Sequence, residues 1–278
     1  MNEVQLILAG IMNNPCPPIS RWVIHDCPIC HNGKSGNYEI KNLKNSTIYQ
    51  KIVQRQMPSS AKTFFEWSQS ENVPSEFINV LDSVYNRNPY LLDLNLYWSP
   101  EKNNDLNFRY IIPYYMNNEI IGYTARDIRK YSKLKYFNQV STNIFYNFDL
   151  LNDPYNKTIL VTEGILDAAL MCGVGINNYL MSDMQIQQLK NAQQKGKRII
   201  IIPDRDKDGK RTIIQAIDNG FDVSLPDWGI KRTENGNVYI KDFEESTRKY
   251  GRLFSTLLIH KNIYSTEFEI KVMMNKWI

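Results

Sequence analysis

The chain has 278 residues, of which 42% are hydrophobic and 22% charged, with a formal net charge of +4. This composition excludes a disordered or fibrous protein and predicts a soluble globular chain of one large domain or two smaller ones. No apolar run approaches the roughly 18 residues that a membrane-spanning helix needs, and the start lacks the basic region of an export signal. We therefore predict a cytoplasmic protein with no membrane partner.

Residues 1–45 hold three of the four cysteines and two of the three histidines. Cys27 and Cys30 form a Cys-x-x-Cys knuckle and are candidate zinc ligands. A structural zinc site needs four ligands, usually from two such knuckles, and no second Cys-x-x-Cys follows. Other side chains nearby could complete the set: Cys16, His25 and His31. The alternatives of a complete zinc site and of no zinc both stay open.

The sequence pattern changes from helical to strand-like in the middle of the chain. Residues 46–95 are predicted to be mostly helical, with polar loops. Residues 96–150 show the alternation of strands, "FRYIIPYYMNNEIIGYTARD", with Asn117 and Asn118 as a hairpin turn.

From residue 151 the pattern alternates between strands and helices, which predicts a largely parallel sheet with helices on its faces. Ser182 or Asp183 is expected to cap one of these helices. The expected strands are 157–164, 176–181, 199–202 and 221–228, and the expected helices are 165–172, 184–196 and 211–220. A last amphipathic helix is expected within 265–278.

Acidic residues follow two of these strands. Glu163 and Gly164 end one strand, and Asp204, Asp206 and Asp208 follow the isoleucine strand. Because ligands bind beyond the carboxyl ends of strands in open α/β sheets, these acids should face one crevice. Carboxylates gathered there repel each other unless a cation neutralises them. Hard oxygen ligands favour Mg²⁺ or Mn²⁺ over zinc.

The segment "DRDKDG" also matches the opening of a calcium-binding EF-hand loop. That loop needs a glutamate six residues beyond Gly209, where this chain has Gln215, and it follows a helix rather than a strand. We therefore reject a calcium loop.

Glu163-Gly164 with Asp167, followed by "PDRDKDG", resembles the TOPRIM domain of bacterial-type primases, topoisomerases and some nucleases. "MSDMQIQQLKN" between them is similar to the segment that these primases place before their Asp-x-Asp strand. Asp242 and Glu245 match a later acidic pair, in which Glu244 could replace one member. The resemblance implies a Rossmann-like parallel sheet and metal ligands at Glu163, Asp167, Asp204, Asp206, Asp208 and Asp242.

The resemblance continues upstream, where "RYIIPYYMNNEIIGYTARDI…KLKYFNQ" is similar to the basic subdomain that precedes TOPRIM in DnaG-like primases. The family pattern falls on Arg109, Arg126, Lys135, Tyr136 and Asn138. "HDCPICHNGKSGNYEI" resembles the first half of the zinc ribbon of these primases. The match covers roughly residues 107–250. Over this range the chain resembles small phage replication primases.

The resemblance implies a DNA-binding nucleotidyltransferase that makes short RNA primers for DNA replication from ribonucleoside triphosphates on a single-stranded DNA template. Glu163, Asp204 and Asp206 would be catalytic through two metal ions, and Arg109, Arg126, Lys135 and Asn138 would bind nucleic acid or nucleotide. The expected divisions are a zinc-ribbon-like region 1–45, a helical segment 46–95, a basic subdomain 96–150, a TOPRIM domain 151–250 and a helical tail 251–278. A phage-encoded protein would work in the host cytoplasm.

Two other functions stay open. A TOPRIM nuclease would use the same acids to cleave nucleic acid, but it gives no reason for the pattern from Arg126 to Asn138. A non-catalytic DNA-binding or helicase-associated factor would explain the incomplete zinc pattern. No P-loop is present in the sequence, so a replicative helicase would be a partner, and the terminal helix is a candidate docking element.

Overall fold

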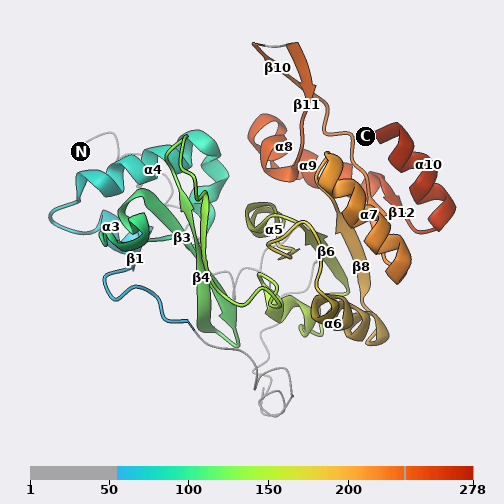
Figure 1. Ribbon diagram of the computed structural model, residues 1–278, viewed down its shortest axis with the longest axis horizontal. Helices are drawn as coiled ribbons and strands as arrows, with labels where there is room; N and C mark the ends of the chain where they lie inside the picture. Colours follow the sequence, from blue (N-terminus) through green and yellow to red (C-terminus); the bar gives the residue numbers. More distant parts are fainter. Residues whose placement is uncertain (1–54, 235, 278) are drawn as a thin grey trace. The chain divides into compact units, whose positions relative to one another are not determined.

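The computed structural model describes residues 55–234 and 236–277. The chain forms two compact units that divide between Ser141 and Thr142 (Figure 1). The predicted cysteine region, with Cys27 and Cys30, lies outside the described residues.

The first unit contains an antiparallel sheet in the order β1-β2-β3-β4-β5. Asn117 and Asn118 join its two longest strands, and both have a positive φ, 53° and 65°. Such left-handed pairs suit the twist of a two-residue hairpin, so the predicted hairpin is confirmed. The strands are β1 (Lys62–Thr63), β2 (Tyr97–Trp98), β3 (Arg109–Met116), β4 (Glu119–Asp127) and β5 (Tyr136–Gln139).

An aromatic cluster holds the helices of the first unit. The ring centroids of Trp67 and Trp98 lie 5.0 Å apart, and the Trp67 indole donates a hydrogen bond of 3.0 Å to the Trp98 carbonyl. Phe77, on the next helix, packs against both rings in a tilted arrangement. The helical elements are α3 (Phe64–Ser68), α4 (Ser75–Arg87), η3 (Pro89–Asp93) and η4 (Asn103–Phe108).

The second unit is built on a five-stranded sheet in the order β12-β9-β8-β6-β7. Four neighbouring strands are parallel, β6 (Thr158–Thr162), β7 (Val174–Gly175), β8 (Arg198–Ile202) and β9 (Asp222–Ser224), and β12 (Ile263–Tyr264) pairs antiparallel with β9. The parallel sheet predicted for this region is therefore present.

One predicted strand was wrong. The strand expected at 176–181 is replaced by β7, which ends at Gly175. Asn177 has a φ of 53°, in the left-handed region that strands do not use. The chain bends there and leads to Ser182, which is the N-cap of the next helix. The Ser182 hydroxyl accepts a hydrogen bond from the backbone amide of Gln185. The structure thus chooses Ser182 over Asp183 as the cap.

Helices cover the sheet of the second unit (Figure 1). Their bounds are α5 (Ile165–Met171), α6 (Asp183–Gln194), α7 (Lys207–Asn219), α8 (Phe243–Tyr250), α9 (Arg252–Lys261) and α10 (Glu267–Trp277), with the short η5 (Phe148–Leu151). A two-stranded hairpin, β10 (Ile230–Thr233) with β11 (Gly236–Tyr239), leads into α8 and was not predicted.

The second unit includes segments on both sides of the predicted TOPRIM range 151–250. Tyr146 forms an antiparallel bridge with Gly175 of β7, so the unit begins before residue 151. At the other end, α10 buries Ile270, Met274 and Trp277, and the Trp277 indole donates to the Pro226 carbonyl at 2.6 Å. These contacts make residues 251–277 part of the unit rather than a separate tail.

Within residues 55–234 and 236–277, the structure contains no helix with the length and apolar character to cross a bilayer.

The isoleucine strand should be the stability centre of the second unit. Ile200 is fully buried in β8, whereas the Ile214 side chain on α7 is 45% exposed. We expect Ile200→Ala to lower the free energy of unfolding by about 2–5 kcal/mol, because it leaves a cavity. Urea unfolding would measure this loss. Ile214→Ala is the matched control and should cost less than about 1 kcal/mol; equal losses would contradict this placement of the core.

Candidate active site

Two carboxylates meet where neighbouring parallel strands end. Glu163 directly follows β6, and Asp204 follows β8 after one proline. Thr162 and Ile202 are paired in register at the ends of these strands, so both acids leave the sheet at the same edge. The Asp204 amide donates to Glu163 Oε1 at 3.3 Å. The structure therefore brings together the two strand-end acids that the sequence predicts.

Two helix starts contribute further acids. Asp167 is buried in the first turn of α5, where its Oδ1 accepts the Glu244 amide at 2.8 Å. Asp242 is the N-cap of α8 and accepts the Glu245 amide at 2.8 Å. A Cβ on Gly164 would lie 2.5 Å from Asp167 Oδ2, so glycine leaves the space that this carboxylate occupies.

A lysine that the sequence analysis missed lies between two of the predicted metal ligands. Lys241 Nζ is 2.7 Å from Asp206 Oδ2 and 3.0 Å from Asp204 Oδ2. The other oxygen of Asp206 caps α7 by accepting the amides of Asp208 and Gly209, each at 2.9 Å. Lysine is common in this chain, and no spacing distinguishes Lys241 from the rest, so the sequence carries no signal for it.

Burial, followed by the charge of neighbouring acids, raises the pKa values of three acids in the cluster. Burial, followed by the charge of Asp204, raises the pKa of Glu163 to about 8. Burial and then Asp242 raise the pKa of Asp204 to about 6, against the pull of Lys241. The pKa of Asp167 is raised well above its usual value by burial first and then by Asp242 and Asp204. These three carboxyl groups therefore hold a proton more readily in the folded protein than they would in water.

Asp206 behaves differently. Burial opposes its ionisation, but Lys241 and the amides of Gly209 and Asp208 outweigh burial and lower its pKa. Asp206 therefore keeps its charge at neutral pH, held between a helix start and an ammonium group.

The remaining predicted acids, Asp208, Glu244 and Glu245, lie in different environments. Asp208 is exposed on α7 and pairs with Arg211 at 3.6 Å, which points its charge to solvent. Glu244 is buried, and its charge acts on Asp167, whereas Glu245 pairs with Lys231. Of the two glutamates that the resemblance left open, Glu244 acts on the acid Asp167, whereas Glu245 accepts the backbone amide of Lys241.

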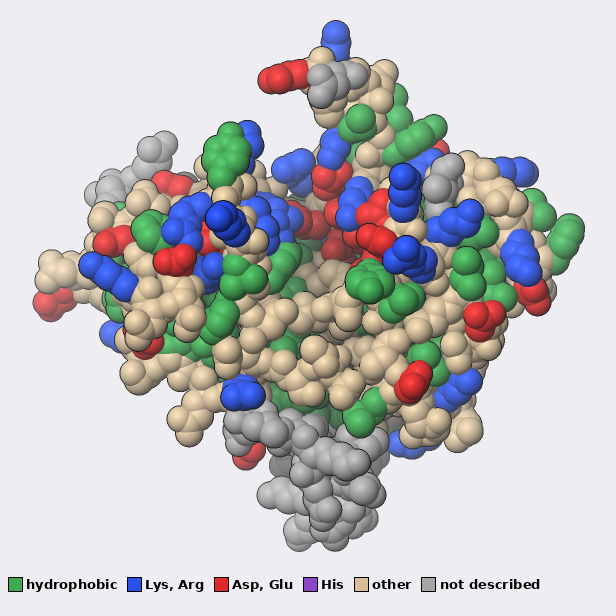
Figure 2. Space-filling model, viewed as in Figure 1, with side chains coloured by type: hydrophobic (Ala, Val, Ile, Leu, Met, Phe, Trp, Pro, Cys, Tyr) green, Lys and Arg blue, Asp and Glu red, His purple; other side chains and the backbone are tan. Residues whose placement is uncertain are grey.

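The donor chemistry of the cluster suits a hard divalent cation, because carboxylate oxygens are the ligands that Mg²⁺ and Mn²⁺ prefer. Lys241 already supplies positive charge between Asp204 and Asp206. Among the residues that the structure describes, no three Asp, Glu, His or Cys side chains converge as metal ligands do. Acidic side chains gather near the base of the β10–β11 hairpin (Figure 2).

In the first unit, Arg109 is buried and its donors are used inside the unit. Its side chain is 2% exposed and pairs with Asp127 at 3.1 Å. Its guanidinium also donates to backbone carbonyls of Asn104, Ala125, Leu134 and Lys135. These contacts use its donors inside the unit, so Arg109 holds the ends of β3, β4 and β5 together.

Three other residues of the family pattern, Arg126, Tyr136 and Asn138, share one face of the sheet. Arg126 pairs in register with Tyr136, and Thr124 with Asn138. The Arg126 guanidinium lies 4.6 Å from the centre of the Tyr136 ring. Asn138 is exposed, and its Oδ1 accepts the Thr124 hydroxyl at 2.9 Å. The spacing of two residues within β5 explains why the sequence could place these side chains together.

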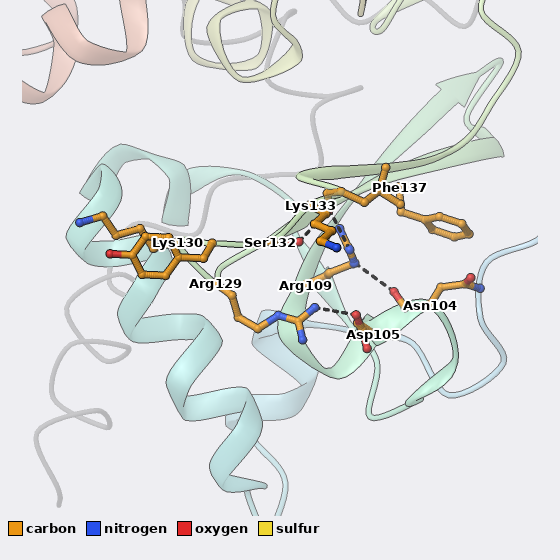
Figure 3. Close-up of a pocket in the computed structure, with 10 residues that line it drawn as sticks. Asn104, Asp105, Arg109, Arg129, Lys130, Ser132, Lys133 and Phe137 are labelled. Carbon is orange, nitrogen blue, oxygen red and sulfur yellow. Dashed lines mark hydrogen bonds and ion pairs between the residues drawn. The ribbon is translucent and has the colours of Figure 1, made fainter.

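Lys135 closes the loop between β4 and β5, because its ammonium donates to the carbonyls of Arg129 and Lys130. This loop lines a pocket of about 590 Å³ that includes Asn104 and Asp105. Figure 3 shows Arg129 directed toward Asp105, to which it pairs at 2.6 Å. Lys130 and Lys133 in the same loop are exposed. The sequence analysis missed this pocket, whose walls come from separate segments.

No family model matches the chain. A curated DNA primase of Mycoplasma genitalium is 25% identical over 144 residues, and the match covers 46% of this chain. The chain spans about a quarter of that relative's length, 24%.

A solved structure of the Aquifex aeolicus primase, with its zinc-binding and RNA polymerase domains, is 15% identical. The superposition has a TM-score of 0.50 and covers 71% of this chain and 58% of that one. The chain resembles the DnaG-like DNA primases. That predicted resemblance is confirmed, and the likeness to the Aquifex structure shows a mixed α/β fold similar to primase RNA polymerase domains. The RNA polymerase domain of Mycobacterium tuberculosis DnaG is 18% identical with a TM-score of 0.47, covering 59% of this chain and 58% of that one.

The raised pKa of Glu163 predicts how stability depends on pH. Between its ordinary value of 4.5 and about 8, Glu163 holds a proton only in the folded state. The contribution of Glu163 to stability should therefore fall as pH rises through this window and level off above 8. We expect a loss of roughly 2 kcal/mol from Glu163, about half the limit set by 1.4 kcal/mol per pKa unit.

Thermal unfolding in EDTA between pH 5.5 and 8.5 would measure this slope. Glu163→Gln should make the slope shallower and stabilise the protein at pH 8, whereas Asp208→Asn, at an exposed acid, should leave the slope unchanged. A Glu163→Gln variant with the same slope as the wild type would contradict the assignment.

Arg109 should matter to folding rather than to binding. We expect Arg109→Met to lower the free energy of unfolding by about 2–4 kcal/mol, because it leaves a buried Asp127 and carbonyl groups with fewer partners. Lys133→Met, in the exposed loop, should change it by less than about 0.5 kcal/mol. If Arg109→Met kept full stability in urea and weakened only DNA binding, a direct contact role would be correct instead.

Proposed function

We propose that the chain is a DNA primase that joins ribonucleotides into short RNA primers on single-stranded DNA. The observation that carries the proposal is the meeting of Glu163 and Asp204 at the ends of adjacent parallel strands, with Asp206 held beside them by Lys241. The local sequence match to a DNA primase supports it.

In this proposal the second unit is a TOPRIM domain. Glu163, Asp204 and Asp206 would hold Mg²⁺ or Mn²⁺, with Asp167 and Asp242 as further acids of the same cluster. The ions would stabilise the charge on the entering and leaving oxygens of the phosphoryl transfer. The chain's own groups orient the ligands, because the Thr212 hydroxyl and the Asp204 amide both donate to Glu163 Oε1, at 3.1 and 3.3 Å.

The first unit would bind the template and the ribonucleoside triphosphates. Arg126 and Asn138 lie on one sheet face with the Tyr136 ring, which combines positive charge with an aromatic surface. Exposed Lys130 and Lys133 at the pocket add charge that phosphates attract. Lys135 would act by shaping this loop, since its ammonium is bound to backbone carbonyls. Basic side chains gather on one face of this unit (Figure 2).

Further parts of the proposal rest on sequence alone. Cys27 and Cys30 would belong to a zinc site, and the protein would be phage-encoded. A replicative helicase is the proposed partner, because the sequence contains no P-loop. The buried face of α10 packs within its own unit, so a helicase would have to contact other surfaces of that helix.

A primer-synthesis assay tests the function. Purified protein would be incubated with single-stranded DNA, Mg²⁺ and labelled ribonucleotides, and the products separated by size. We expect short labelled RNA from the wild type and at least a ~100-fold loss in Asp204→Asn and Asp206→Asn, because these acids would hold the ions. Asp208→Asn should keep activity close to that of the wild type, since its carboxylate points to solvent.

Other products would change the assignment. Shortened DNA without ribonucleotide incorporation would favour the nuclease. Binding of DNA with neither product, even when a helicase is added, would favour a non-catalytic factor.

A further inference from the structure

Lys241 occupies the position between two carboxylates that a bound cation would share. Its ammonium lies within 3.0 Å of an oxygen of Asp204 and of Asp206. The other oxygen of Asp206 is used by the start of α7. The oxygen of Asp206 that faces Lys241 is therefore the one left to bind a metal in the proposed site.

The backbone of Lys241 is fixed to the acidic loop. Its carbonyl accepts the Arg205 amide at 2.7 Å, between the two acids, and its own amide donates to Glu245 Oε2 at 3.2 Å. Arg205 is itself held, because its Nε donates to the Trp277 carbonyl at 2.6 Å. The attachment point of the lysine thus stays beside Asp204 and Asp206 whatever its side chain does.

The side chain of Lys241, in contrast, can leave. It is 45% exposed, so its ammonium can rotate into water without moving the anchored backbone. A divalent ion carries twice the charge of an ammonium group and is smaller. It therefore interacts more strongly with the same two carboxylates. The Lys241 ammonium and a metal ion would then compete for the same position beside Asp204 and Asp206.

We propose that Lys241 is an internal counter-cation that holds Asp204 and Asp206 in place until a divalent ion displaces its ammonium. The inference rests on the metal site in the proposed function. It makes metal binding an exchange of cations, in which Lys241 competes with the ion and loses its contact when the ion binds.

Direct Mn²⁺ titration of the full chain, by calorimetry and without nucleotides or DNA, tests the exchange. We expect Lys241→Met to bind Mn²⁺ roughly fivefold or more tightly than the wild type, because the competitor is gone. Lys231→Met is the matched control, since it removes the same charge from the neighbouring hairpin. In the wild type, Lys231 pairs with Glu245 rather than with Asp204 or Asp206. It should shift the affinity by less than about twofold.

Unchanged or weaker Mn²⁺ binding in Lys241→Met would overturn the inference, and weaker binding would make Lys241 a positioning residue. A failure of the proposed metal site is distinguishable. In that case the wild type would show no saturable Mn²⁺ binding, or its binding would persist in Asp204→Asn/Asp206→Asn.

A measurement on the wild type avoids any folding defect of the variant. Amine labelling followed by mass spectrometry would compare the modification rate of Lys241 with and without Mn²⁺. We expect the rate to rise roughly threefold or more on Mn²⁺ addition, because displacement exposes the ammonium, while the rate at Lys231 stays constant. An unchanged rate at Lys241 under saturating Mn²⁺ would refute the displacement.

Discussion

The burial of several carboxyl groups side by side is the constraint on which the second unit depends. Parallel pairing of β6 with β8 delivers Glu163 and Asp204 to one sheet edge, and the starts of α5, α7 and α8 add Asp167, Asp206 and Asp242. Burial raises the pKa values of three of these acids. A protein keeps such an arrangement only if other interactions hold the elements in place.

Close packing of the backbone supplies that support. A Cβ on Gly209 would lie 1.9 Å from the Asp204 carbonyl oxygen, so glycine lets the first turn of α7 press against the acidic loop. The apolar strand β8 anchors the loop on its other side, with Ile200 fully buried. Uncharged groups thus fix the backbone that carries the acids, and Lys241 pairs with the side chains of Asp204 and Asp206.

The first unit places its charges by a different principle. Arg109 and Arg129 meet Asp127, and Arg129 also meets Asp105, so these arginines are used to shape the sheet ends and the loop. Exposed positive charge falls instead on Lys130 and Lys133. A buried guanidinium with its donors paired is a structural element, and an exposed lysine remains available to a polyanion.

The sequence by itself determined the hairpin at Asn117, the isoleucine strand, and the acids at Glu163 and Asp204 that follow two parallel strands. These features are local, because turn residues, β-branched runs and strand ends each depend on a few neighbouring positions. Only the tertiary structure decided that Lys241 faces Asp204, that Arg109 is buried, and that Asp208 points to solvent. Those outcomes depend on which distant segments pack together, and a side chain's charge says nothing about its partner until packing brings the two within contact.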